Sequence, residues 1–194
     1  GTNATTPVGS HPMRLPCIPF AALLAVVACM LTACVSVPER ANGSFVERSI
    51  DVAGTAHRYQ VFVPASAAGG RRPPVIMFLH GSGERGNDGA KQTQVGIGPY
   101  IRAHQDEFPA IVVFPQAPDD TAWSGNAGLV FAALDAATRE LHGDQDRTYL
   151  TGLSMGGYGT WEMAMRSPGR FAALVPVCGG LLHPRRPSMG VAGL

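Results

Sequence analysis

Ser154 lies at the centre of a Gly-x-Ser-x-Gly pattern, Gly152-Leu153-Ser154-Met155-Gly156. A serine in this pattern becomes a nucleophile when it occupies a sharp turn between a strand and a helix, where a side chain at either flanking glycine would clash with neighbouring backbone. Such a turn also points the start of the helix, with its partial positive charge, toward the anion that forms during acyl transfer. The alternative interpretation is an ordinary serine in a glycine-rich turn.

A second segment with chemical potential is His80-Gly81-Ser82-Gly83, which follows an apolar run. Acyl transfer requires two N–H donors aimed at the developing oxyanion, one from the residue after the nucleophile and one from the loop after the third strand. We therefore assign these donors to the backbone N–H groups of Met155 and Ser82. His80 is interpreted as a buried residue that holds its loop by hydrogen bonds, because in this architecture the catalytic base follows the nucleophile in the chain.

Strands and helices must bring these two segments together. Two segments that alternate apolar with polar residues around Ala53-Gly54 predict an antiparallel hairpin at a sheet edge; they are 45–52 and 57–64. The short, continuously apolar runs 75–79 and 110–114 predict strands buried on both faces of a parallel sheet. A third and a fourth buried strand are expected at 149–151 and 171–177. Helices are expected near 100–105, at 128–142 and at 158–166. This order predicts an α/β fold with a mostly parallel sheet, flanking helices and an N-terminal antiparallel hairpin.

Composition excludes several classes of protein. The chain has 194 residues, the length of one domain, and its 15 Lys+Arg and 14 Asp+Glu leave a formal net charge of +1. Binding to a phosphate backbone needs an excess of basic residues, so we expect no nucleic-acid partner. The sequence holds no Cys/His cluster with zinc-ligand spacing, so we expect no metal and no cofactor.

Residues 1–34 are interpreted as upstream sequence followed by a targeting signal. The apolar run 15–33 follows Arg14, and a charged start before an apolar stretch is typical of a secretory signal. The run ends in Leu31-Thr32-Ala33-Cys34, which resembles the bacterial lipoprotein box, in which the cysteine is lipidated. We therefore expect an exported protein, either a membrane-anchored lipoprotein attached through Cys34 or a periplasmic or extracellular one. A retained transmembrane anchor is the alternative, and Pro16 and Pro19 disfavour it.

The targeting signal divides the remainder of the chain. Residues 35–44 are expected to form a linker and residues 45–194 the globular domain. Cys178 is then the single cysteine of the domain, and its position after an apolar run predicts a small buried residue.

Five motifs in a fixed order resemble a known family. They are LHGSGERG at 79–86, FPQAP at 114–118, Trp123, DRTYLTGLSMGGYGTW at 146–161 and FAALVPVCGG at 171–180. Together they are similar to the α/β-hydrolase superfamily over roughly residues 45–180. Within it, the chain resembles the secreted carboxylesterase branch that includes feruloyl esterases and polyhydroxybutyrate depolymerase-like proteins, and also dienelactone hydrolases and phospholipase/carboxylesterase relatives.

The resemblance implies the α/β-hydrolase fold and hydrolysis of a small-molecule or polymeric ester. The reaction would proceed through an acyl-enzyme on Ser154, activated by a histidine that an acidic residue orients. The resemblance also implies that Gln116 and Trp123 lie near the mouth of the substrate pocket. The competing interpretations are that Gln116 holds a loop by hydrogen bonds and that Trp123 packs in the core.

The chain departs from the family after Ser154. Only one acidic residue, Glu162, and one histidine, His183, follow the nucleophile. Glu162 falls two turns along the helix, where a salt bridge or a solvated position is expected. The family supplies two further strands, one followed by the acid and the next by the base, so we expect these C-terminal strands to be missing here.

Three hypotheses account for this departure. The chain is truncated or frameshifted, or His183 acts as a base without an acid partner, or the protein is a non-catalytic surface lipoprotein that binds a ligand or partner in the inherited pocket. A serine peptidase of the prolyl-oligopeptidase type shares the same motif, but such peptidases usually include a propeller domain, for which the chain has no room.

Overall fold

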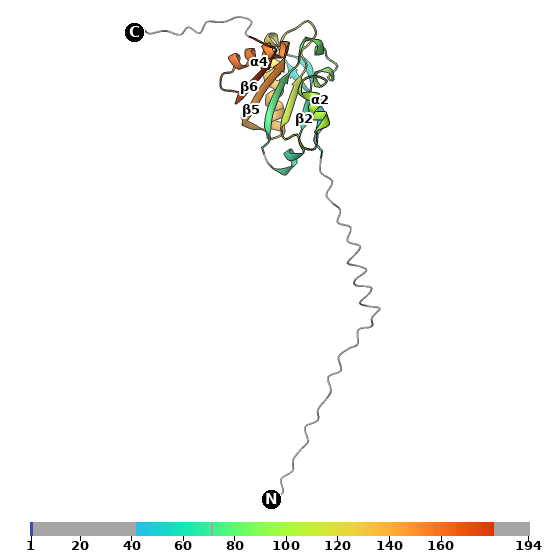
Figure 1. Cartoon of the computed structure of the whole chain (residues 1–194), viewed down its shortest axis with the longest axis vertical. Coiled ribbons are helices and arrows are strands. Elements are labelled where there is room, and N and C mark those ends of the chain that lie inside the picture. The colour runs from blue at the N-terminus through green and yellow to red at the C-terminus, as the bar shows by residue number, and fades with distance from the viewer. Residues whose placement is uncertain (2–41, 71, 181–194) are drawn as a thin grey trace, which may run out of the picture. The chain divides into compact units, whose positions relative to one another are not determined.

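A six-stranded mixed sheet organises the described part of the chain. The computed structural model describes residue 1 and residues 42–70 and 72–180. The strands are β1 (Ser44–Val52), β2 (Thr55–Val63), β3 (Pro74–Leu79), β4 (Ile111–Pro115), β5 (Asp144–Leu153) and β6 (Ala173–Val177), and their spatial order is β1-β2-β4-β3-β5-β6. The first two strands form an antiparallel hairpin, β2 pairs antiparallel with β4, and the strands from β4 to β6 run parallel. The predicted α/β architecture is therefore confirmed (Figure 1).

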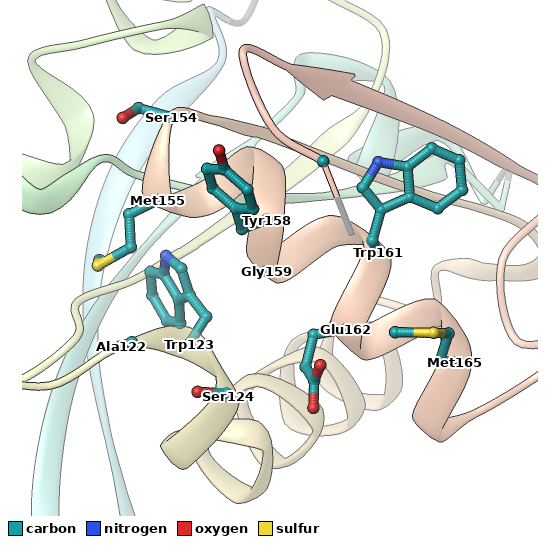
Figure 2. A pocket seen from close by; sticks show the side chains of 11 residues that line it. Ala122, Trp123, Ser124, Ser154, Met155, Tyr158, Gly159, Trp161, Glu162 and Met165 are labelled. Carbon is teal, nitrogen blue, oxygen red and sulfur yellow. The ribbon is translucent and has the colours of Figure 1, made fainter. Parts of the chain in front are cut away.

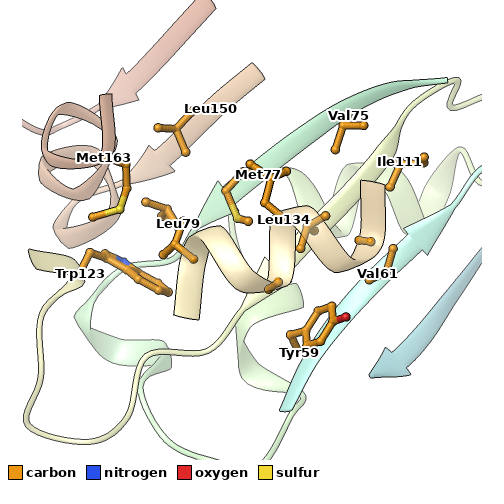
Figure 3. Packing of buried hydrophobic residues seen from close by; sticks show 14 of the residues in the cluster. Tyr59, Val61, Val75, Met77, Leu79, Ile111, Trp123, Leu134, Leu150 and Met163 are labelled. Atoms are coloured by element: carbon orange, nitrogen blue, oxygen red, sulfur yellow. The ribbon is translucent and has the colours of Figure 1, made fainter. Parts of the chain in front are cut away.

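Helices cover both faces of this sheet. The α-helices are α2 (Ile97–Ala103), α3 (Ala127–Glu140) and α4 (Met155–Arg166), and four short 3-10 segments are η1 (Ala65–Gly69), η2 (Ser82–Glu84), η3 (Lys91–Thr93) and η4 (Trp123–Gly125). Because successive side chains of a strand point to opposite faces of the sheet, the buried residues form two clusters, one on each face. Met77 and Val113 pack with Leu134 of α3 and Met163 of α4, as Figure 3 shows for several of them. Phe78 packs with Phe114 and with Ile101 of α2 on the other face. Burying apolar surface on both faces is what stabilises such a layered fold.

The prediction for strand 171–177 is wrong in its burial. Of the β6 side chains, Val175 is 58% exposed and Val177 43% exposed, although Leu174 packs against the core. Within the described residues, β6 ends the sheet order and pairs only with β5, and the side chains of one of its faces, Val175 and Val177 among them, are exposed. The prediction that Cys178 is buried fails for the same reason, because the residue follows this edge strand and is exposed.

Two element boundaries also differ from the predictions. The strand expected at 149–151 extends over Asp144–Leu153, and the helix expected from 158 begins at Met155. Three glycines within the first turns of α4 lower the helix propensity of this segment, since glycine destabilises a helix interior by about 1 kcal/mol relative to alanine. The sequence pattern therefore did not predict the first turn of the helix. The extra turn matters for function because it places the start of α4 directly after Ser154.

Candidate active site

Ser154 occupies a strained turn between β5 and α4. Its backbone angles are φ 55° and ψ −114°, in a region that non-glycine residues rarely adopt. The Ser154 N–H donates to the carbonyl of Val177 at 2.9 Å, and the Ser154 carbonyl accepts from the N–H of Tyr158 at 3.1 Å. Conformations of this kind cost about 1–3 kcal/mol and persist where the surrounding structure imposes them. The Ser154 residue is exposed at the carboxyl edge of the sheet.

The two glycines of the motif allow the turn to lie close to β3. A Cβ atom on Gly156 would collide with the carbonyl oxygen of Leu79 and lie 2.8 Å from that of His80. A Cβ atom on Gly152 would lie 2.8 Å from the Leu79 oxygen and collide with the carbonyl of Gly156. Both positions therefore require glycine because the backbone approaches too closely for a side chain, which is the reason for the flanking glycines that the sequence analysis gave.

The loop after β3 lies beside Ser154. A Cβ built on Gly81 would be 3.8 Å from the Cβ of Ser154 and 3.6 Å from the carbonyl oxygen of Leu153. Ser82 is the first residue of η2 and Met155 the first residue of α4, so neither N–H group has an acceptor within its own helix. The structure thus places the two predicted donor residues on adjacent segments next to the serine.

His80 is buried and holds this loop. Its Nε2 accepts a hydrogen bond from the N–H of Ala117 at 2.9 Å, so its Nδ1 is the protonated nitrogen and donates to the Gly81 carbonyl at 2.6 Å. The indole of Trp123 packs edge-on against the imidazole, with 4.9 Å between ring centroids, and Trp123 Nε1 donates to the His80 carbonyl at 3.0 Å. Burial lowers the pKa of His80 below its ordinary value. Both ring nitrogens are occupied by backbone partners, as expected for a structural histidine.

A pocket of about 270 Å³ adjoins Ser154 (Figure 2). Its lining comes from η4 and the residue before it, from the turn, from one face of α4, and from Gly180. These residues are Ala122, Trp123, Ser124, Ser154, Met155, Tyr158, Gly159, Trp161, Glu162, Met165 and Gly180. Ser154 lies where α4 begins, whereas Glu162 and Met165 lie farther along the helix. Three aromatic and two methionine side chains contribute to the lining, which suits an apolar group of a small molecule.

Glu162 is the carboxylate of this pocket, and it is paired. Its Oε1 lies 2.9 Å from Nη2 of Arg166, one turn along α4. This pairing confirms the salt bridge expected from the sequence. Among the described residues, no three histidine, cysteine, aspartate or glutamate side chains form a group suited to a metal ion. None of the described helices is long and apolar enough to cross a membrane.

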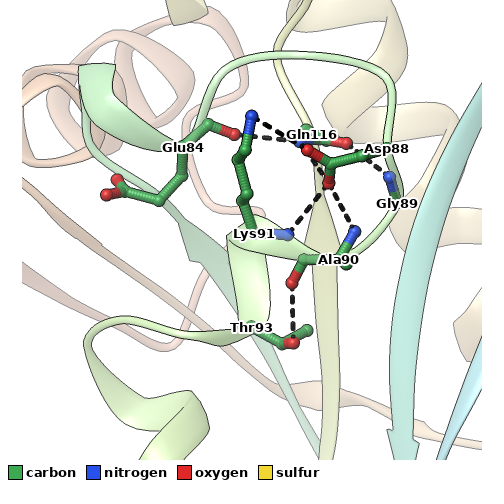
Figure 4. Close-up of polar contacts among 7 residues, drawn as sticks. All are labelled: Glu84, Asp88, Gly89, Ala90, Lys91, Thr93 and Gln116. Carbon is green, nitrogen blue, oxygen red and sulfur yellow. Dashed lines mark hydrogen bonds and ion pairs between the residues drawn. The ribbon is translucent and has the colours of Figure 1, made fainter.

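Gln116 fixes the loop that follows η2 (Figure 4). Its Nε2 donates to the Glu84 carbonyl at 3.0 Å and to Oδ1 of Asp88 at 3.2 Å, and its Oε1 accepts from the N–H of Gly89 at 2.8 Å. The Asp88 carboxylate also accepts the N–H groups of Ala90 and Lys91, and these bonds hold its pKa well below its usual range. The loop is therefore ordered by its own side chains and by Gln116, which directly follows β4.

Comparison with known proteins decides the family. No family model matches the chain. Acetylxylan esterase A of Emericella nidulans is 25% identical over 134 residues, which is 62% of this chain and 41% of that protein. The crystal structure of a thermostable esterase superposes with a TM-score of 0.59 at 35% identity, covering 71% of this chain and 41% of the other. A ferulic acid esterase gives a TM-score of 0.54 at 21% identity, covering 69% and 57%. The chain belongs to the α/β-hydrolase superfamily.

Its similarity lies with the esterase branch, as the sequence motifs indicate. This α/β-hydrolase chain spans about two fifths of the length of the acetylxylan esterase and of the thermostable esterase. Two of the predicted site residues, His183 and Cys34, lie outside the described residues.

The structure corrects one predicted pocket residue of this α/β-hydrolase and adds others. Gln116 does not line the pocket, because its buried amide bonds to the loop at Glu84 and Gly89. Trp123 lines the pocket and also packs in the core. The sequence analysis missed the face of α4 formed by Tyr158, Trp161 and Met165. They follow Ser154 and one another at helical intervals of three or four residues, and this spacing is the signal that would have found them.

Because the imidazole of His80 is buried and neutral, we expect the α/β-hydrolase domain to lose stability in mild acid. The unfolded chain binds the His80 proton with a pKa of about 6.5, and the folded chain binds it with a lower one. The stability that the neutral imidazole contributes is therefore fully present above about pH 6.5. It is lost as the pH falls from 6.5 toward the lower pKa of the folded chain. Urea unfolding at several pH values between 8 and 5.5 measures this slope. The variant His80→Gln has no titrating group at this position and should show a shallower slope; equal slopes would contradict the assignment.

Proposed function

We propose that this chain is a serine hydrolase of carboxylic esters that reacts through an acyl-enzyme on Ser154. The observation that supports this most is the backbone of Ser154, held at φ 55° on a turn at the wall of an apolar pocket. A strained residue held by its surroundings at a cleft is typical of a functional site. An ordinary serine in a glycine-rich turn would not need both flanking glycines in backbone contact with β3.

In the proposed reaction the Oγ of Ser154 attacks the ester carbonyl carbon. The carbonyl oxygen becomes an oxyanion, which the N–H groups of Met155 and Ser82 stabilise because both point from the starts of helical segments. The C–O bond to the alcohol then breaks, and the alcohol leaves with the proton that the serine lost. Water hydrolyses the acyl-enzyme and restores the serine. A histidine after the nucleophile would carry this proton, and His183 is the candidate within the given sequence. Glu162, paired with Arg166, is not assigned as its partner.

The substrate class follows from the pocket. Trp123, Trp161 and Tyr158 form aromatic walls, with Met155 and Met165 beside them. We propose an ester with an apolar or aromatic group of small-molecule size, free or attached to a polymer. The names of the similar proteins, an acetylxylan esterase and a ferulic acid esterase, are compatible with this class.

Ligand binding without turnover is the second candidate function. It is favoured by the pairing of Glu162, the carboxylate of the pocket, with Arg166, which leaves this carboxylate engaged elsewhere. Under this hypothesis the pocket retains affinity for esters or carboxylic acids, but Ser154 is not activated.

We propose in addition that the protein is exported and lipidated at Cys34. The support is the apolar run 15–33 that ends in Leu31-Thr32-Ala33-Cys34. Metabolic labelling with a palmitate analogue tests this, and loss of the label in Cys34→Ser is the expected result.

Reaction with a fluorophosphonate distinguishes the two candidate functions. We expect the wild-type chain to acquire one covalent adduct, because the probe reports an activated serine beside an oxyanion site. Ser154→Ala should abolish the adduct, whereas Ser49→Ala, which removes an exposed serine of β1, should leave it unchanged. Intact-protein mass spectrometry measures the adduct. An unlabelled wild-type chain that still binds an ester analogue would favour the binding function instead.

A further inference from the structure

Arg85 joins three segments around the candidate active site. It lies in the loop after β3, immediately after η2. Its Nε donates to the carbonyl oxygen of Thr121 at 2.5 Å, and its Nη2 contacts the Sδ of Met155 at 3.0 Å. Thr121 belongs to the loop after β4, which continues into the pocket wall at Trp123, and Met155 begins α4. One guanidinium therefore contacts the other two segments that form the site.

The backbone of Arg85 is fixed on both sides. The carbonyl of Glu84, the preceding residue, accepts the Nε2 hydrogen bond of Gln116 at 3.0 Å. The N–H of Gly86, the following residue, donates to the Ala117 carbonyl at 3.0 Å. Both partners lie just beyond the end of β4. The guanidinium therefore extends from a point that is anchored to the sheet, so its contacts can hold other groups in place.

Thr121, the far partner, is also held. Its Oγ1 donates to the Pro118 carbonyl at 2.8 Å and accepts from Nδ2 of Asn126 at 2.9 Å. The Arg85 side chain is half-buried and crosses between two fixed segments to reach Met155. The Met155 side chain, which also packs against the main core cluster, is thus held from the side of the loop by Arg85.

We propose that Arg85 is a positioning residue, which fixes the two oxyanion donors relative to each other by binding the Met155 side chain from the loop that contains Ser82. The inference rests on the function proposed above. An oxyanion site works because its donors are placed before charge develops, so small displacements are costly. Met155 has a flexible side chain that does not by itself define a backbone position.

Arginine suits this role because its planar guanidinium offers several N–H donors in a fixed geometry. One nitrogen can bind Thr121 while another contacts Met155. Lysine has the same charge but a single ammonium on a flexible stem, and so does not reproduce two contacts in a fixed geometry. Arg85→Lys therefore separates the effect of geometry from that of charge.

The test is the rate of fluorophosphonate labelling of Ser154, resolved into the reversible affinity for the probe and the rate of bond formation. We expect Arg85→Lys and Arg85→Ala to slow bond formation by about 10- to 100-fold, since a misplacement of about 1 Å can cost 100-fold. The reversible affinity should not change. Guanidinium chloride, at a concentration far below that which unfolds the protein, should partly restore the rate in Arg85→Ala, and sodium chloride at the same ionic strength should not. A structural role alone would not produce rescue specific for guanidinium.

Arg48→Lys is the matched control. Arg48 also contacts its partner through more than one nitrogen, since its Nε and Nη2 both donate to Glu140, but it lies on β1 away from the pocket. Its substitution should leave labelling unchanged. Labelling of Arg85→Lys at the wild-type rate would overturn the inference while leaving the proposed function intact. A wild-type chain that is not labelled would remove the proposed function, and the inference with it.

Discussion

Replacing Gly156 with alanine is expected to destabilise the fold by at least about 3 kcal/mol, at the upper end of what overpacking costs. The new Cβ would collide with the carbonyl oxygen of Leu79 and lie 2.8 Å from that of His80. Neither carbonyl can move freely. Leu79 is paired with Gly152 in the β3–β5 ladder, and the His80 carbonyl accepts the indole N–H of Trp123. Either α4 must shift away from β3 or the centre of the sheet must deform. The free energy of unfolding in urea, followed by tryptophan fluorescence and circular dichroism, measures the loss.

Gly125→Ala is the matched control for this substitution. A Cβ at Gly125 in η4 would meet no atom within 4 Å, and the backbone there is not left-handed. Its effect should stay within about 0.5 kcal/mol, as for most surface substitutions. If Gly156→Ala were as stable as Gly125→Ala, the turn at Ser154 could not be packed against β3 as described, and the strained geometry of the serine would lose its cause.

The parts of the fold that could be predicted are those whose signal is local. The apolar runs at 75–79 and 110–114 became β3 and β4, because strands buried on both faces have no polar positions to confuse the pattern. Helix α3 followed from its spacing of apolar residues. The start of α4 was missed because its glycines were chosen by close packing against β3 and β6, which overrides their poor helix propensity.

The errors arose where burial depends on a distant part of the chain. The sequence of β6 reads as a buried strand, yet the exposure of Val175 and Cys178 is determined by what lies beside the sheet edge. Gln116 was assigned to the pocket on the resemblance to the family. Its actual partners, Glu84 and Gly89, come from a loop about thirty residues earlier, and local pattern does not reveal such pairings.

The candidate site likewise has a part that local sequence predicts and a part that only the fold reveals. The positions of Ser154, Met155 and Ser82 could be predicted because each depends on a turn that the adjacent residues specify. The contact between Arg85 and Met155 joins residues 70 positions apart, and it became visible only in the fold, where the loop after β3 lies beside the start of α4. A motif therefore identifies the reacting groups, whereas the fold identifies what holds them.

Trp123→Ala is expected to lower the free energy of unfolding by about 3–5 kcal/mol, the usual cost of deleting a buried aromatic side chain, and to abolish ligand binding in the pocket. Trp123 is 1% exposed and packs within the main core cluster. Its Nε1 donates to the His80 carbonyl at 3.0 Å, and its ring meets the imidazole edge-on. Removal would leave a cavity and an unpaired buried carbonyl at the base of the loop that contains Ser82. Urea unfolding and the affinity for an ester analogue measure the two effects.

Trp161→Ala separates the pocket from the core. Trp161 lines the same pocket from α4 but is only half-buried, so its removal should weaken binding while costing much less stability than Trp123→Ala. Trp123→Phe gives a second test, because it retains an aromatic ring but removes the N–H donor. Its cost should be about 1–3 kcal/mol, the penalty for a buried acceptor left without a partner. If Trp123→Ala and Trp161→Ala were equally destabilising, Trp123 would not connect the pocket wall to the core, and the loop after β4 would be free to move relative to Ser154.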